Sequence, residues 1–219
     1  MRALTALPRD LLDLIAPPRC AACDATYPGE ALCALCRDAL LPAEESPEGV
    51  RAVYLHGGPI ASAIHRAKYG EDPRVASRLG ALLLPVLPER AGLVIPIPLH
   101  RRRLIARGFN QAAQLAAPVA RHLGATLLRE GLLRVRETPS QTTLDRGHRA
   151  ANLAGALVVP RAEVVRGRTV VVVDDVSTTG ATMRAAFAAL RAAGAAEVCG
   201  VVLAAAALRI SSARRSPEG

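Results

Sequence analysis

The stretch VVVVDDVSTTGAT at residues 170–182 decides the fold. Its run of valines has no alternation of polar and apolar residues, which is typical of a strand covered on both faces. The acidic residues Asp174 and Asp175 follow this strand, and a hydroxyl-rich loop then leads to a helix expected to begin near Thr182. Because open α/β sheets bind ligands at the carboxyl ends of their strands, we expect a ligand site here.

The segment from Ser177 to Thr182 has the composition of a phosphate-binding loop. Free backbone N–H groups at the start of a helix, together with nearby hydroxyls, bind phosphate oxygens, and Gly180 allows a tight turn beside the anion. The two carboxylates would repel a bare phosphate unless they bind sugar hydroxyls or a metal ion. The predicted ligand is therefore a sugar phosphate with Mg²⁺. A plain helix N-cap would explain neither the acid pair nor the density of hydroxyls.

Short apolar runs alternate with helical patterns from residue 50 onward. Strands are expected at 50–55, 93–97, 156–159, 169–173 and 198–203, and helices at 60–69, 75–87, 110–123 and 182–193. This alternation predicts an α/β fold with a mostly parallel sheet flanked by helices. The longest uninterrupted apolar stretch, Val201 to Leu208, is too short to cross a bilayer, so no membrane insertion is expected.

Four of the five cysteines form two C-x-x-C pairs, Cys20 with Cys23 and Cys33 with Cys36. Two such pairs can supply a tetrahedral thiolate shell for a structural Zn²⁺ ion. A redox pair would not explain the duplication, and two disulfides would require an export signal. Cys199 lies in an apolar run and is expected in the core.

The N-terminal region is expected to form a small module of its own. Residues 1–16 have apolar residues at helical spacing, and two aspartates interrupt them, so they predict an amphipathic helix rather than an export signal. We therefore expect a cytoplasmic protein. Residues 39–49 are acidic and rich in Pro and Gly, which is typical of a linker. The predicted domains are a zinc-ribbon-like module at 1–48 and an α/β domain at 49–219.

The net charge of +9 is unevenly distributed. Residues 1–50 hold four arginines against eight acidic residues, whereas residues 51–219 hold 24 basic against 11 acidic residues. Ten arginines lie within residues 101–149, which contain only three acidic residues. The excess favours an anionic ligand, either a small phosphate or a nucleic acid. The chain has only five aromatic residues, too few for an extended base-stacking surface.

Motifs along nearly the whole chain resemble the ComF family, in which competence-associated and GntX-like proteins carry a zinc finger fused to a phosphoribosyltransferase-like domain. The acid pair and its loop look like the motif that holds phosphoribosyl pyrophosphate (PRPP) in type I phosphoribosyltransferases. The segments that narrow the resemblance are Pro17-Pro18-Arg19-Cys20, His65-Arg-Ala-Lys68-Tyr69, Pro96-Ile-Pro98-Leu-His-Arg, Arg107-Gly-Phe-Asn110-Gln111, Arg136-x-Thr138-x-x-Gln141 and Arg149-x-x-Asn152. Leu157 departs from the pattern, because an aromatic residue is expected there.

The resemblance implies a role for each part of these motifs. The acid pair would contact the ribose hydroxyls, directly or through Mg²⁺. The residues that would hold the 5′-phosphate are Ser177, Thr178, Thr179, Gly180, Ala181 and Thr182. The cations expected near pyrophosphate are Lys68, Arg101, Arg102, Arg103 and Arg107, and the residues expected to act in catalysis are Asp174, Asp175 and Arg107. A hood over the site would span residues 134–152, with Arg136, Gln141, Arg149 and Asn152.

Two functions follow from these expectations. The first is an enzyme that transfers ribose 5-phosphate from PRPP to an unidentified acceptor, with Mg²⁺, in connection with DNA uptake. The second is a non-catalytic competence factor that binds single-stranded DNA or the DNA-uptake machinery and is regulated by PRPP. The acid pair favours the first function, and the arginine excess is compatible with both.

Overall fold

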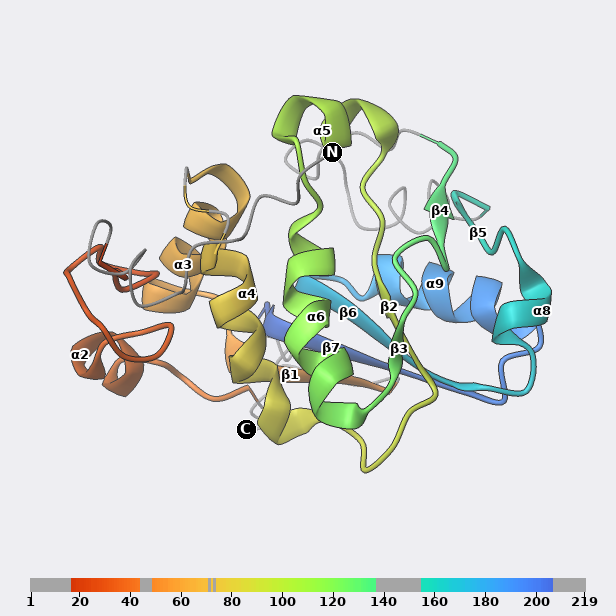
Figure 1. The fold of residues 1–219 in the computed structure, drawn as a ribbon, viewed down its shortest axis with the longest axis horizontal. Helices are drawn as coiled ribbons and strands as arrows, with labels where there is room; N and C mark the ends of the chain where they lie inside the picture. Colours follow the sequence, from red (N-terminus) through yellow and green to blue (C-terminus); the bar gives the residue numbers. More distant parts are fainter. Residues whose placement is uncertain (1–16, 44–48, 71, 73, 137–154, 207–219) are drawn as a thin grey trace, which may run out of the picture.

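A five-stranded parallel sheet forms the centre of the computed structural model, which describes residues 17–43, 49–70, 72, 74–136 and 155–206 (Figure 1). Its strand order is β1-β7-β6-β2-β3, and every neighbouring pair is parallel. The strands are β1 (Val50–Leu55), β2 (Leu93–Pro96), β3 (Thr126–Leu127), β6 (Thr169–Ser177) and β7 (Glu197–Ala205). The sheet confirms the expected α/β fold and places β6 in its middle.

Strand β6 is longer than the sequence pattern predicts. The apolar run ends at Val173, but the ladder to β7 continues through Asp174 and Ser177, which pair with Val202 and Ala205. The acid pair therefore lies inside the strand rather than after it. A separate two-stranded antiparallel sheet, β4 (Leu133–Arg134) with β5 (Leu157–Val158), was not expected as a pair.

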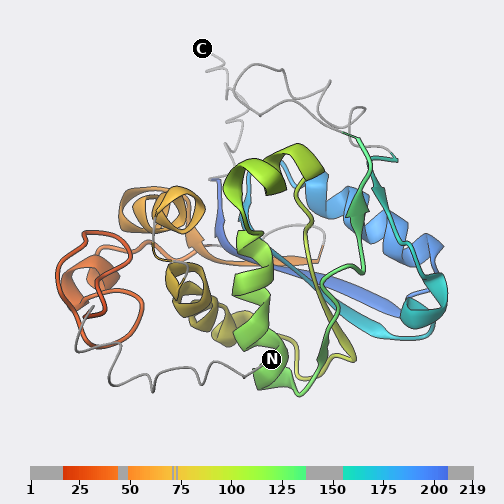
Figure 2. The ribbon, with the colours of Figure 1, turned by 45° about the horizontal axis from the view of Figure 1, so that its top comes forward.

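Helices cover both faces of the central sheet (Figures 1 and 2). The helices of the described residues, not all of which contact the sheet, are α2 (Ala34–Asp38), α3 (Gly58–Tyr69), α4 (Arg74–Gly80), the 3₁₀ helix η1 (Ala81–Val86), α5 (Arg101–Arg107), α6 (Gln111–Leu123), α8 (Ala162–Val165) and α9 (Ala181–Ala192). The helix expected at 75–87 is instead α4 followed by η1. Pro85 lies within η1, and because proline has no backbone N–H it cannot continue an α-helical ladder.

The core has one hydrophobic layer on each face of the sheet. Val171 and Val173 pack in the layer that contains the buried side of α6, whereas Val170 and Val172 pack in the layer that contains the buried side of α9. Successive residues of a strand face opposite sides of a sheet. Asp175 continues the Val171 and Val173 side, so the two adjacent carboxylates belong to opposite faces.

The described part of the N-terminal module packs into the first of these layers. Cys20, Ala21 and Leu32 are buried in the same cluster as the apolar sides of α3 and α4. Figure 2 shows α3 and α4 between this module and the sheet. Arg78 of α4 donates a hydrogen bond of 2.7 Å to the carbonyl oxygen of Arg19, which ties the two parts together.

The contact between α4 and α6 depends on a glycine, and this gives a first prediction. A Cβ at Gly80 would lie 2.4 Å from Cγ of Pro118 and 2.6 Å from the carbonyl oxygen of Leu115. Because backbone cannot move aside as a side chain can, we expect Gly80→Ala to lower the free energy of unfolding by about 1–3 kcal/mol. Denaturant unfolding measures the change. Gly57→Ala is the matched control, since a Cβ there meets nothing within 4 Å. Equal stability of the two variants would contradict the packing argument.

Within the described parts of the chain, no helix combines the length and the apolar character that a membrane span requires. The amphipathic helix expected at residues 1–16 lies outside the described residues.

Candidate functional site

The carboxyl end of β6 opens into a small hollow that continues into α9. Asp174 and residues 176–183 line it, and its volume of about 10 Å³ is comparable to the space that one water molecule needs. Gly180 has a left-handed φ of 73°, the tight turn expected at this glycine. Helix α9 begins directly afterwards, at Ala181, whose N–H donates to Oγ1 of Thr179 over 3.4 Å. A strand end, a tight turn and a helix start are therefore joined within a few residues.

The Asp175 carboxylate is buried and has two partners. Its Oδ1 lies 2.9 Å from Nζ of Lys68 on α3, and its Oδ2 accepts a hydrogen bond of 2.9 Å from Nε2 of Gln111 on α6. The side chain of Asp175 is 8% exposed and that of Lys68 is 24% exposed. The structure thus brings together Lys68 and Asp175, which the sequence places more than 100 positions apart.

Gln111 extends this network to Arg107. The Nη1 atom of Arg107 donates to Oε1 of Gln111 over 2.6 Å, and its guanidinium carbon lies 4.9 Å from the centre of the Tyr69 ring. Gln111 is itself buried, although polar side chains are usually exposed. Gln111 lies within one of the motifs quoted above, but no role was expected for it. The sequence feature that could have indicated a role for Gln111 is its position at the start of a predicted helix, beside arginines.

Asp174 behaves differently from its neighbour. Burial, reinforced by the charge of Asp175, raises the pKa of Asp174 to about 7. The N–H of Asp175 donates a hydrogen bond of 2.9 Å to Oδ1 of Asp174. This hydrogen bond and the charges of Lys68 and Arg134 oppose the rise in the pKa of Asp174 without cancelling it. Near neutral pH this carboxyl can therefore gain or lose a proton.

The raised pKa of Asp174 predicts a pH dependence of stability. Between the ordinary value of 3.8 and about 7, the unfolded chain releases this proton while the folded chain keeps it. The free energy of unfolding should therefore fall as the pH rises through this window. Asp174→Asn, which cannot titrate, should lack this component and be more stable than wild type above pH 7. Denaturant unfolding of both proteins from pH 4 to 8, without added Mg²⁺, measures it. Parallel pH profiles would contradict the assignment.

A further arginine at this site was not singled out in the sequence. Arg134 lies on β4, at the first position of the expected hood, and its pKa is lowered by burial, while the charge of Asp174 opposes that lowering and Arg103 adds to it. Its buried Nε has no hydrogen-bond partner among the described residues. The pairing of β4 with β5 brings Arg134 opposite Leu157, a contact that the sequence pattern did not reveal.

The arginines after Ile97 lie on a helix. Residues 97–100 form a short loop, and α5 then begins, with Nδ1 of His100 accepting from the N–H of Arg102 over 3.4 Å. Arg101 and Arg102 are exposed, whereas Arg103 is half-buried. Asn110 donates from Nδ2 to the carbonyl oxygen of Ile97 over 3.0 Å, which holds the two ends of this segment together.

Of the four expected hood residues, only Arg136 is described, and it is exposed. Gln141, Arg149 and Asn152 lie outside the described residues.

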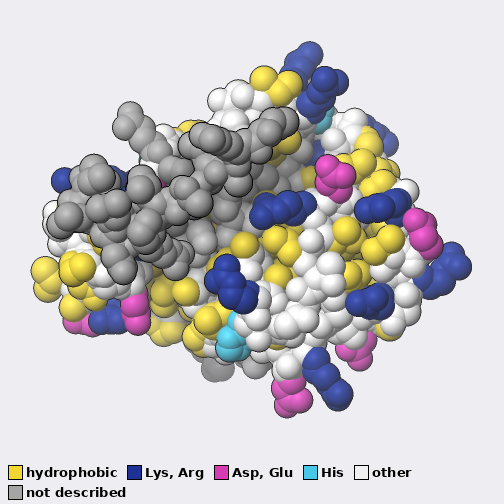
Figure 3. Space-filling view, in the orientation of Figure 1, with side chains coloured by type: hydrophobic (Ala, Val, Ile, Leu, Met, Phe, Trp, Pro, Cys, Tyr) yellow, Lys and Arg dark blue, Asp and Glu magenta, His cyan; other side chains and the backbone are white. Residues whose placement is uncertain are grey.

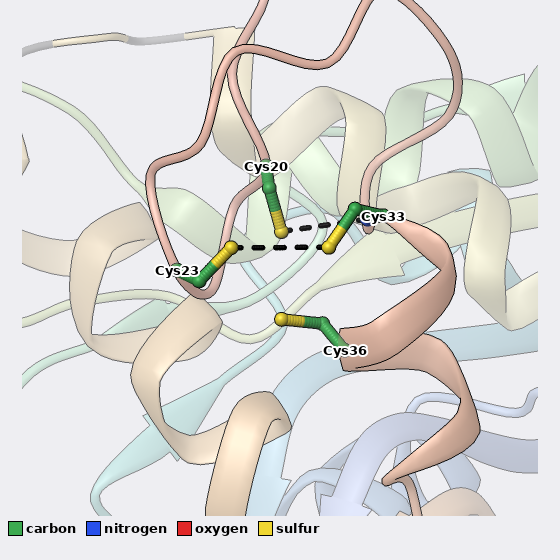
Figure 4. Close-up of side chains that lie close together, drawn as sticks. All are labelled: Cys20, Cys23, Cys33 and Cys36. Atoms are coloured by element: carbon green, nitrogen blue, oxygen red, sulfur yellow. Dashed lines mark hydrogen bonds between the residues drawn. The ribbon is translucent and has the colours of Figure 1, made fainter.

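The four paired cysteines form a second cluster, in the N-terminal module. Figure 4 shows their sulfur atoms turned toward a common point, and all four lie within 4.8 Å of one another. None forms a disulfide, and Sγ of Cys23 lies 3.8 Å from Sγ of Cys33. Tetrahedral Zn²⁺ with bonds of about 2.3 Å requires sulfur atoms about 3.8 Å apart, so the cluster fits that ion.

Ionisation within this cluster is uneven. Burial alone would raise the pKa of Cys20, but backbone N–H groups, those of Cys23 and Cys33 foremost, hold it at about 6. Burial and hydrogen bonds to the neighbouring thiols raise the pKa of Cys36 to about 12. Four thiols so close together cannot all ionise unless a cation lies between them. A metal ion bound by the four thiolates would supply that cation.

The fold and the β6 site define a class of protein. A family model described as "Phosphoribosyl transferase domain" matches residues 110–215, a range that contains α6, β6, the hydroxyl loop and α9. Together with the parallel sheet, this match makes the α/β domain a type I phosphoribosyltransferase fold.

Two similar proteins have names that refer to DNA utilization and to competence. DNA utilization protein YhgH of Escherichia coli K12 is 40% identical over 134 residues, 57% of this chain and 58% of that protein. Competence protein F of Haemophilus influenzae is 38% identical over 114 residues, 51% of this chain and 48% of that one. The chain matches less than two thirds of the length of these relatives. A solved glutamine phosphoribosylpyrophosphate amidotransferase from B. subtilis is 25% identical, with a TM-score of 0.44 over 63% of this chain and 30% of that one.

Proposed function

We propose that this chain binds PRPP at the carboxyl end of β6 and, with Mg²⁺, transfers its ribose 5-phosphate to an acceptor. The observation that carries the proposal is the joining of Asp174 and Asp175 to the loop at 177–182 within one strand–turn–helix unit. The match to the phosphoribosyl transferase domain covers this unit. The relatives named for competence and DNA utilization support a role in the handling of incoming DNA.

The two ends of PRPP require different chemistry, and the chain offers both. The 5′-phosphate would accept hydrogen bonds from the hydroxyls and free N–H groups at the start of α9. The ribose hydroxyls and Mg²⁺ require carboxylate oxygens, which the acid pair supplies. Asp174 would be the carboxylate that binds Mg²⁺, because Lys68 and Gln111 already bind both oxygens of Asp175. Asp175 would act mainly by fixing Lys68 beside the ligand.

The transfer step requires stabilisation of a leaving pyrophosphate. A bond forms between the nucleophile and ribose C1, the bond from C1 to the pyrophosphate oxygen breaks, and the pyrophosphate leaves with the electron pair. Fixed cations stabilise the negative charge that develops on the leaving group. We assign this task to Lys68, Arg107 and the arginines at 101–103. Mg²⁺, when bound, would neutralise a further part of the negative charge on the leaving pyrophosphate.

The four cysteines would bind a structural Zn²⁺ ion, since four protein ligands leave no open position for chemistry. Reduced cysteines around a metal fit a cytoplasmic protein. The proposed division of the chain is a zinc module at 1–48 and a phosphoribosyltransferase domain at 49–219.

Calorimetric titration with PRPP, with and without Mg²⁺, tests the proposal. Wild type should bind PRPP, more tightly with Mg²⁺, and Asp174→Asn should weaken the Mg²⁺-dependent binding at least tenfold. Glu163→Gln, which removes an exposed acid on α8, is the matched control and should bind like wild type. Absence of binding by wild type in both conditions would overturn the sugar-phosphate assignment. Release of pyrophosphate with a panel of nucleobases and amines then separates catalysis from binding.

A second function, binding of single-stranded DNA regulated by PRPP, is favoured by the arginine excess and by the names of the relatives. Among the described residues on the face in Figure 3, however, Lys and Arg side chains are separated by acidic and apolar ones and form no continuous stripe. Salt-dependent binding of an oligodeoxynucleotide that is lost on charge reversal of Arg101, Arg102 and Arg103 would establish this function. Competition by PRPP would show that the two ligands share a surface.

A further inference from the structure

Gln111 is a buried amide, 5% exposed, and both ends of its side chain are bound. Its Nε2 donates a hydrogen bond of 2.9 Å to Oδ2 of Asp175 on β6. Its Oε1 accepts a hydrogen bond of 2.6 Å from Nη1 of Arg107, the last residue of α5. Because Asp175 is buried as well, displacement of the amide would leave a carboxylate oxygen without a donor where water reaches poorly.

The two partners of Gln111 require an amide at this position. A carboxylate only accepts hydrogen bonds and a guanidinium only donates them, so the side chain between them needs a donor at one end and an acceptor at the other. Glutamine has both groups. An ionised glutamate has the same shape but would place a second carboxylate against Asp175, and methionine would bind neither partner. The residue type therefore matches the two opposite charges that it joins.

Gln111 completes a chain of contacts that begins and ends with a cation. Nζ of Lys68 lies 2.9 Å from Oδ1 of Asp175. The other oxygen of this carboxylate is bound by Gln111, which in turn binds Arg107. The two terminal cations also line one cavity of about 430 Å³. The chain therefore fixes, relative to each other, two cations that the proposed function assigns to pyrophosphate.

Arg107 depends on Gln111 for its position. No residue of α5 is buried, and Gly108 follows the helix with a left-handed φ of 79°, so the helix end gives the arginine little support. A second contact joins the guanidinium carbon to the centre of the Tyr69 ring over 4.9 Å, but that ring is 66% exposed. Contacts of this kind are weak at exposed sites. Loss of the amide would therefore let the guanidinium move into solvent.

The backbone that carries Gln111 is itself held in place. Asn110, the N-cap of α6, accepts at Oδ1 a hydrogen bond of 3.1 Å from the N–H of Ala112. Its Nδ2 donates over 3.0 Å to the carbonyl oxygen of Ile97, directly after β2. The amide thus extends from a fixed backbone to two fixed partners. A cation held in this way loses little conformational freedom when an anion binds.

We propose that Gln111 is a positioning residue that holds the guanidinium of Arg107 in place for a bound pyrophosphate group. It acts through Arg107 and needs no contact with the ligand. The inference rests on the proposed function for the identity of the ligand, whereas the positioning of Arg107 is a property of the protein alone.

The first test is equilibrium binding of PRPP and of inorganic pyrophosphate, each with Mg²⁺, to the folded variants. Gln111→Met keeps most of the side-chain volume but removes both hydrogen bonds, and it should weaken both ligands at least tenfold. Gln114→Met, the same change three residues along α6, is the matched control and should bind like wild type. Wild-type affinity of Gln111→Met would overturn the inference.

A double-mutant cycle shows whether the effect passes through the arginine. Arg107→Met removes the group that Gln111 positions, so adding Gln111→Met to it should weaken pyrophosphate less than threefold. Equal losses of affinity in wild type and in the Arg107→Met background would contradict the positioning role.

Gln111→Glu supplies an isosteric variant. A protonated glutamic acid donates to Asp175 and accepts from Arg107 as glutamine does, whereas the ionised form cannot donate. Its affinity for pyrophosphate, relative to wild type at the same pH, should therefore be at least threefold closer to wild type at pH 5 than at pH 8. Lys68, Arg107 and Asp174 also carry charge near this position, but they are common to both proteins. A ratio that does not change with pH would contradict the role of the amide.

A measurement without ligand separates this inference from the proposed function. NMR relaxation of the Nε–H group of Arg107 should show an ordered side chain in wild type and a mobile one in Gln111→Met. An ordered Arg107 in that variant would refute the inference. A mobile Arg107, in a protein whose wild type binds neither PRPP nor pyrophosphate, would support the positioning of Arg107 and refute the transferase. PRPP binding that Gln111→Met leaves unchanged would do the reverse.

Discussion

Replacing Lys68 with methionine should lower the free energy of unfolding by about 3 kcal/mol, because it leaves the buried carboxylate of Asp175 without its cation. Water reaches Asp175 poorly, since its side chain is only 8% exposed. The remaining partner, Gln111, offers an amide donor but no charge. Methionine keeps most of the volume of lysine, so the loss should report on charge rather than on packing.

A double-mutant cycle tests this prediction. Asp175→Asn removes the charge that needs compensation, so Lys68→Met should cost much less in that background than in wild type. The pair of Arg74 and Asp72 is the control, because the arginine side chain is 43% exposed. Arg74→Met should cost less than about 1 kcal/mol. If Lys68→Met is no more destabilising than Arg74→Met, the buried pair does not contribute as proposed.

Loss of the proposed Zn²⁺ ion from the cysteine cluster should have the second large effect. Structural Zn²⁺ in small thiolate sites contributes an apparent binding free energy on the order of 10 kcal/mol to folding. Cys20 belongs to the same hydrophobic layer as α3 and α4, so the damage should reach the main domain. We expect Cys36→Ala to abolish stoichiometric zinc and to lower the melting temperature by at least 10 °C, which corresponds to a loss of roughly 3 kcal/mol or more.

Cys199→Ala is the matched control, since Cys199 lies on β7 and is not part of the cluster. It should keep one zinc per chain by elemental analysis. A chelator added to wild type should reproduce the melting temperature of Cys36→Ala and have no further effect on that variant. Full stability of the zinc-free protein would contradict the structural role.

The features predicted best from the sequence are those encoded in consecutive residues. The valine run, the acid pair and Gly180 stand next to one another in the chain, so their order already determines a buried strand, a tight turn and a helix start. The two C-x-x-C pairs likewise need only one short turn each, and their sulfur atoms do meet at one point. The parallel sheet followed from the alternation of strands and helices.

The features that the sequence did not predict depend on contacts between distant segments. Strand β6 continues through the acid pair because β7 lies alongside, a reason that the local apolar pattern does not contain. Arg134 acquires its place beside Asp174 only when β4 pairs with β5. The role of Gln111 depends on Lys68, Asp175 and Arg107 arriving from three different elements.

Helix α3 has one further consequence. Arg66 pairs with Asp24 of the N-terminal module, while Lys68, two residues along the same helix, pairs with Asp175 in the central strand. Because neighbours two positions apart project from opposite sides of a helix, α3 connects the N-terminal module to the acid pair of β6 through these two ion pairs. If the cysteine cluster holds the proposed Zn²⁺ ion, loss of zinc would loosen the anchoring of Lys68 and lower the affinity for PRPP at the proposed site.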